Sequence, residues 1–210
     1  MVSLVKLRLY GQPSFESTPI FCCLKEETKN ALRSLPCVYK RAVAALRFRQ
    51  QISGPHSVSD EDREIMQVAY LRTSLMEFVA MEEVLPFDLQ ERGLSEKPLK
   101  MEATENAMLI LLRELRHLQL HVVTTTFSKE VRSAMYIGQE KTLKIEIVPL
   151  TDLLEIKQLK NAKRYDPVEL DAAINWLNEA QLNWGIGDVL QRGVQVYADI
   201  LVNKYNLHTP

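Results

Sequence analysis

The fold is decided by residues 104–120, which read TENAMLILLRELRHLQL. Apolar residues recur there at helical spacing and occupy much of the circumference, which is typical of a helix buried on most sides. At about 100° per residue, one stripe is wholly apolar and consists of Met108, Leu111, Leu112, Leu115 and Leu118. The opposite side is expected to hold Arg113, Glu114, His117 and His121, with Arg116 at the flank. We expect this helix to be the most buried element of the fold.

Further helices are predicted on both sides of this stretch. Residues 26–51 have apolar positions at helical spacing, and Pro36 falls inside the run, where it is expected to open the main helix. Residues 59–84 predict another helix that begins at the capping residue Ser59 and ends before Pro86, followed by a connector over 87–101. Beyond residue 149 we expect a short helix from Thr151, a longer one from Asp166-Pro167, a break over 184–188 and a last helix over 188–205.

Short segments with β-strand patterns complete the architecture. Residues 122–127 (VVTTTF) are rich in β-branched side chains, and residues 143–148 (LKIEIV) alternate, so they predict a hairpin closed around Gly138 by a turn longer than a tight one. Residues 4–10 also alternate and predict a short edge strand. The expected fold is mostly α, an antiparallel helical bundle with a β-hairpin insertion at 122–149. We expect residues 1–210 to form a single helical domain, in which 1–25 are an N-terminal strand and loop.

Composition excludes several classes of function. The net charge is −1, with 26 basic and 27 acidic residues, which argues against a broad surface for duplex nucleic acid. Only seven glycines argue against a Gly-rich phosphate loop. Three cysteines, without metal-ligand spacing, favour reduced thiols in the cytoplasm. The N-terminus lacks the apolar core of a signal peptide, and no run approaches the ~20 apolar residues of a membrane span, so we expect no membrane association.

Arg116 and His121 are the candidate catalytic residues. Arginine stays charged at physiological pH and histidine exchanges a proton near neutrality, so together they suit metal-free cleavage of a phosphodiester. On an ideal helix the two side chains are about 140° apart. They would converge only if the helix ends after Leu120, or if two chains meet across a twofold axis.

The Arg116-x4-His121 spacing near the end of a bundle helix resembles the motif Arg-x4-6-His of the HEPN superfamily (higher eukaryotes and prokaryotes nucleotide-binding domains). This chain has His117 where ribonuclease members often have asparagine, and Val123 where the toxin subfamily often has tyrosine. The resemblance implies a homodimer whose two motifs line one cleft, and cleavage of single-stranded RNA in stress or phage defence without metal or cofactor.

The same resemblance implies the role of each residue. His121 would act as general base or acid, Arg116 would neutralise charge in the transition state, and His117 and Arg113 would be secondary phosphate contacts. A protein partner or antitoxin is not identified by the sequence.

A structural role for the same residues remains open. Arg116 would then pair with an acidic residue of a neighbouring helix, and His117 and His121 would cap the helix C-terminus, where cations are favoured. In that case the protein is a non-catalytic helical module for protein interaction or oligomerisation. Self-association is expected through residues 109–120 or through the last helix, which is apolar over a wide arc.

A metal site is not expected. Glu77, Glu82 and Glu83 form a carboxylate cluster, but a ferritin-like site needs Glu-x-x-His pairs on facing helices, and only Glu114–His117 has that spacing.

Overall fold

The computed structural model describes residues 4–9, 23–53, 59–121, 127–136 and 139–207. The helices are α1 (Glu26–Leu32), α2 (Pro36–Ile52), α3 (Asp60–Glu91), α4 (Ala107–His121), α5 (Leu150–Leu154), α6 (Pro167–Trp184) and α7 (Ile186–Lys204). Three short 3-10 helices are η1 (Met101–Thr104), η2 (Glu155–Gln158) and η3 (Lys160–Arg164), and the strands are β1 (Ser128–Tyr136) and β2 (Gln139–Ile147). The prediction of a mostly α bundle with a β-hairpin is confirmed.

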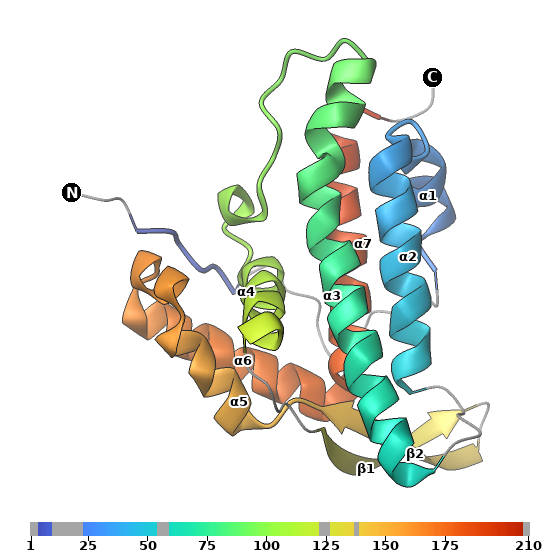
Figure 1. Ribbon diagram of the computed structural model, residues 1–210. Coiled ribbons are helices and arrows are strands. Elements are labelled where there is room, and N and C mark those ends of the chain that lie inside the picture. Colours follow the sequence, from blue (N-terminus) through green and yellow to red (C-terminus); the bar gives the residue numbers. More distant parts are fainter. Residues whose placement is uncertain (1–3, 10–22, 54–58, 122–126, 137–138, 208–210) are drawn as a thin grey trace.

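The bundle is built around α2, α3 and α7. Figure 1 shows α2 beside α3 and running in the opposite direction, with α7 behind them, while α6 and the hairpin lie across one end. Helix α7 contacts α1, α2, α3, α4, α6 and β2, so it is the centre of the fold. This position explains its wide apolar arc, because each side of the helix faces a different neighbour.

Burial of α4 and α7 changes the interpretation of their apolar surfaces. Residues 107–112 are all fully buried, and Leu190, Val194 and Tyr197 of α7 are buried as well. Much of the apolar surface expected to mediate self-association is therefore covered within one chain, while Val196 and Ile200 of α7 are only partly buried. The burial of α4 itself agrees with the sequence prediction, apart from one residue described below.

Local signals set several of the helix ends. The backbone N–H of Asp62 donates to Ser59 Oγ at 3.1 Å, and the N–H groups of Val168 and Glu169 donate to Asp166 Oδ1 at 2.9 and 3.1 Å. Pro36 is the first residue of α2, as predicted. Gly185 separates α6 from α7 with φ 77°, a backbone angle that favours glycine.

Helix α3 does not end before Pro86, and this prediction was wrong. The helix continues to Glu91, with Leu85 and Leu89 buried on either side of the proline. Buried Asp88 accepts hydrogen bonds from the backbone N–H groups of Cys37 (3.0 Å) and Val38 (2.8 Å). It thereby caps α2, whose own N-cap residue makes no such bond. Burial and this cap offset the hydrogen bond that proline removes.

The hairpin differs from its prediction in where its strands begin and end. Strand β1 begins at Ser128 and pairs antiparallel with β2 from Ser128–Ile147 to Tyr136–Gln139. Tyr136 pairs with Gln139, so the prediction of a longer turn was wrong. The predicted closing residue, Gly138, lies outside the described residues. The first strand begins beyond the β-branched run on which the prediction rested. Of that run, residues 122–126 lie outside the described residues. The expected strand over 4–10 is reduced, within residues 4–9, to isolated bridges of Val5 with Tyr165 and Arg8 with Asn106.

Polar side chains attach the hairpin to the bundle. The Val148 N–H donates to Gln181 Oε1 at 2.9 Å, and Gln181 Nε2 donates to the Val148 carbonyl at 2.6 Å. Buried Glu146 accepts hydrogen bonds from Ser53 (2.5 Å) and Gln67 (3.0 Å). Within the part of the chain that the structure describes, no helix is long and apolar enough to cross a membrane.

Candidate functional site

Arg113 is held by acidic groups at the junction of α4 and η1. Its Nη1 pairs with Glu102 Oε1, and Arg164 pairs with both oxygens of the same carboxylate. Burial alone would lower the pKa of Arg113, but the nearby carboxylates of Glu82, Glu102 and Glu114 raise it overall. Both guanidinium groups stabilise the charged form of Glu102 and lower its pKa against the opposing effect of burial. Arg113 therefore fixes the fold here rather than projecting toward solvent.

Arg116 is less firmly held. Its side chain is 24% exposed, and its Nη2 lies 3.9 Å from Glu83 Oε1, at the outer limit of an ion pair, while the Glu83 side chain is 60% exposed. The Nε atom is buried and has no hydrogen-bond partner within the described residues. An ion pair this long and this exposed contributes little to stability. Arg116 is thus available to contact a further anion.

Glu114 and His117 form a carboxylate–imidazole pair one turn apart on α4. Glu114 is fully buried, and its Oε2 lies 3.2 Å from His117 Nδ1. Tyr165 donates its hydroxyl to Glu114 Oε1 at 2.7 Å, and Asn161 Nδ2 donates to Oε2 at 3.4 Å. Burial and the Glu114 charge both raise the pKa of Tyr165, which keeps its hydroxyl protonated as a donor. The carboxylate is therefore held in place by two donors from the 160–165 segment.

Two groups lie against His117 Nδ1. Glu114 Oε2 is 3.2 Å and Asn161 Nδ2 is 3.3 Å from this nitrogen. In the tautomer that carries its proton on Nδ1, the carboxylate accepts that proton in a hydrogen bond and Nε2 is the acceptor nitrogen of the ring. The His117 side chain is 23% exposed, and no described residue forms a hydrogen bond with Nε2. A histidine oriented in this way by a buried carboxylate suits general acid–base catalysis.

The predicted site residues are only partly brought together. Arg113, Arg116 and His117 lie within the described part of α4, but Arg113 is committed to Glu102. His121 is the last residue of α4. Its side chain lies outside the described residues, so the convergence of Arg116 and His121 stays a prediction.

Glu114 is the main correction to the predicted site. The helical projection placed it on the polar side opposite the core, but it is fully buried, because Asn161 and Tyr165 cover that side of α4. The segment that supplies these two residues is distant in sequence, so the pattern of α4 alone did not reveal it. The apolar character of α4 around much of its circumference was the one available signal.

Two carboxylates of the cluster on α3, Glu77 and Glu82, contact groups of the protein itself. Glu77 pairs with Arg41 at 2.9 Å, and Glu82 accepts a hydrogen bond from the Met101 N–H at 2.6 Å. Among the described residues, no group of three or more His, Cys, Asp or Glu side chains is arranged to hold a metal ion.

Comparison of the chain with protein-family models, curated proteins and solved structures found no match.

Proposed function

We propose that the protein is a metal-independent ribonuclease that cleaves single-stranded RNA at the end of α4. The observation that carries this proposal is the partly exposed imidazole of His117, oriented by the buried carboxylate of Glu114 and adjacent in sequence to the weakly paired Arg116. The resemblance to the HEPN superfamily adds the substrate class and a role in stress or phage defence. The cysteine pattern supports a cytoplasmic location.

The proposed reaction uses the 2′-hydroxyl of RNA as the nucleophile. An imidazole nitrogen takes the 2′-hydroxyl proton, the 2′-oxygen attacks phosphorus, and the bond to the 5′-oxygen breaks. A second, protonated imidazole donates a proton to the leaving 5′-oxygen, which gives a 2′,3′-cyclic phosphate and a 5′-hydroxyl end. His117 and His121 supply the base and the acid, and Arg116 neutralises charge on the phosphoryl oxygens.

We further propose a homodimer that forms through α3. Ile65, Met76 and Phe87 are exposed at 63%, 47% and 63%. They recur every eleven residues, a spacing that drifts by only about 20° on a helix, so they form a row on one face of α3, the α3 stripe, at intervals of roughly 16 Å. Glu83, the neighbour of Arg116, lies one turn before Phe87 on this helix. A second copy seated on the stripe would bring its own α4 toward the same cleft.

The test is cleavage of single-stranded RNA in the presence of EDTA. Wild type should release 2′,3′-cyclic phosphate ends, and the Arg116→Ala/His121→Ala variant should not. His117→Ala should lower the rate by about 10²–10⁴-fold, the usual contribution of general acid–base catalysis. Arg47→Ala, at an exposed arginine of α2, is the matched control and should retain activity.

A non-catalytic helical module is the alternative outcome of this experiment. The hydrogen bonds of Glu114 also join α4 to the 160–165 segment, so each variant's thermal unfolding is measured beside its activity. Equal cleavage by wild type and the Arg116→Ala/His121→Ala variant, or none by either, would remove the ribonuclease proposal.

A further inference from the structure

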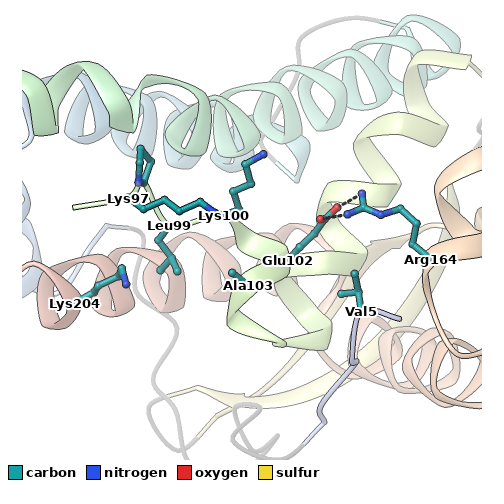
Figure 2. Close-up of a pocket in the computed structure, with 9 residues that line it drawn as sticks. Val5, Lys97, Leu99, Lys100, Glu102, Ala103, Arg164 and Lys204 are labelled. Carbon is teal, nitrogen blue, oxygen red and sulfur yellow. Dashed lines mark hydrogen bonds and ion pairs between the residues drawn. The ribbon is translucent and has the colours of Figure 1, made fainter. Parts of the chain in front are cut away.

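A basic cavity of about 520 Å³ opens between residues 97–103, the N-terminal segment and the C-terminal end of α7. Figure 2 shows Lys97 and Lys204 on one side of the cavity and the Glu102–Arg164 pair on the other, with Lys100 between them. Its apolar wall consists of Val5, Pro98, Leu99 and Ala103. The cavity falls within the size range of small-molecule sites, which is roughly 300–1,000 Å³.

The charges that line this cavity are not balanced. Its described lining residues include one acid, Glu102, which is already paired with Arg164 and with the partly buried Arg113 behind it. The three lysines form no ion pair within the described residues. Like charges gathered in a concave site repel one another and concentrate a field that attracts anions. The three lysines of the cavity therefore have no acidic partner among the described residues.

Two tyrosines of the C-terminal region hold the lysine-bearing wall in place. The Leu99 N–H donates to the Tyr205 hydroxyl at 2.9 Å, and that hydroxyl donates to the Lys97 carbonyl at 3.2 Å. Fully buried Tyr197 donates to the Leu99 carbonyl at 2.8 Å. On the other side, the Val5 N–H donates to the Arg164 carbonyl at 2.8 Å. A wall fixed before binding lowers the entropic cost of holding a ligand.

We propose that this cavity binds a small organic phosphate. A phosphate monoester carries about −1.5 to −2 charges at pH 7, which suits a cavity lined by three lysines and by one acid that is already paired. Lysine binds phosphate as a point charge, and the apolar wall accommodates the organic part of the ligand. This site is distinct from the His117 pair, and its occupancy is measured by binding rather than by RNA cleavage.

The experiment is isothermal titration of the full chain at low salt with phenyl phosphate, inorganic pyrophosphate and phenol. Both phosphates should bind, phenyl phosphate with an apolar contribution, and phenol should not. The K97Q/K100Q/K204Q variant should bind phenyl phosphate about 100-fold more weakly, from about fivefold for each lysine. Tyr205→Phe should also weaken binding, because it releases the Leu99 N–H and the Lys97 carbonyl.

The K25Q/K40Q/K129Q variant is the matched control, since it removes the same charge at three exposed lysines that do not line the cavity. It should bind phenyl phosphate as wild type does. Equal loss in both triple variants would show nonspecific electrostatics and overturn the proposal. It would also be overturned if phenyl phosphate failed to bind at about 5 mM, or if only a single-stranded RNA bound in a manner that depends on Lys97, Lys100 and Lys204.

Discussion

Gly193→Ala tests how α4 is packed against α7. A Cβ atom built on Gly193 would collide with Cδ1 of Leu112 and would lie 3.7 Å from Cζ of Phe78. Leu112 is on α4 and Phe78 is on α3, and both are fully buried. Gly193 therefore lies where α7 packs tightly against side chains of both helices, and the position of α4 depends on the absence of a side chain there.

The expected cost follows from two opposing terms. Replacing glycine with alanine inside a helix stabilises it by about 1 kcal/mol. Inserting a methyl group into a filled core destabilises by about 1–3 kcal/mol, and the upper end applies because Leu112 is enclosed and cannot move into solvent. The net loss is about 2 kcal/mol, which corresponds to a fall in Tm of about 4–8 °C for a chain of this size.

Urea unfolding followed by circular dichroism measures this loss as a lower midpoint at an unchanged m value. Gly187→Ala is the control on the same helix, because its Cβ would meet the Arg49 side chain only at ordinary contact distances of 3.5 and 3.8 Å. It should be neutral or stabilising. Leu112→Ala should relieve the collision, so the double variant should be more stable than the sum of the single losses predicts. If Gly193→Ala stabilises as Gly187→Ala does, the described packing of α4 is refuted.

Two further predictions concern the surface and the core of α3. Met76→Glu should convert the proposed dimer to a folded monomer in size-exclusion chromatography with light scattering, and a wild type that is already monomeric at tens of micromolar would contradict dimerisation. Asp88→Ala should lower the free energy of unfolding by about 2–3 kcal/mol, because it leaves the Cys37 and Val38 N–H groups without their partner. Asp166→Ala, at the more exposed cap of α6, should cost about 1 kcal/mol, and equal losses in the two variants would refute the special role of Asp88.

Much of the fold follows from local signals in the sequence. Ser59 and Asp166 mark helix starts through their own side chains, and Pro36 and Gly185 act through their backbone geometry. The apolar run of α4 predicted its burial, since a helix that is apolar around much of its circumference is stable only when neighbouring elements cover it.

The failures have a common physical cause, which is contact between segments distant in sequence. Pro86 ends a helix by local rules, but the cap that Asp88 provides to α2 is a tertiary interaction. The helical pattern of α4 places Glu114 at the surface, but in the folded chain Tyr165 covers it. The basic cavity draws its charges from three separate parts of the chain, none of which is a basic run on its own.

The proposal that the protein cleaves RNA through the 2′-hydroxyl is tested with two otherwise identical single-stranded substrates in EDTA, one of them carrying 2′-deoxy sugars throughout. The proposed reaction requires the 2′-hydroxyl, so wild type should cleave only the ribose substrate and leave 2′,3′-cyclic phosphate ends, and His117→Ala should lose this activity while remaining folded. The proposed ribonuclease reaction would be contradicted by cleavage of the deoxy substrate, by 3′-hydroxyl ends, or by an undiminished rate in His117→Ala.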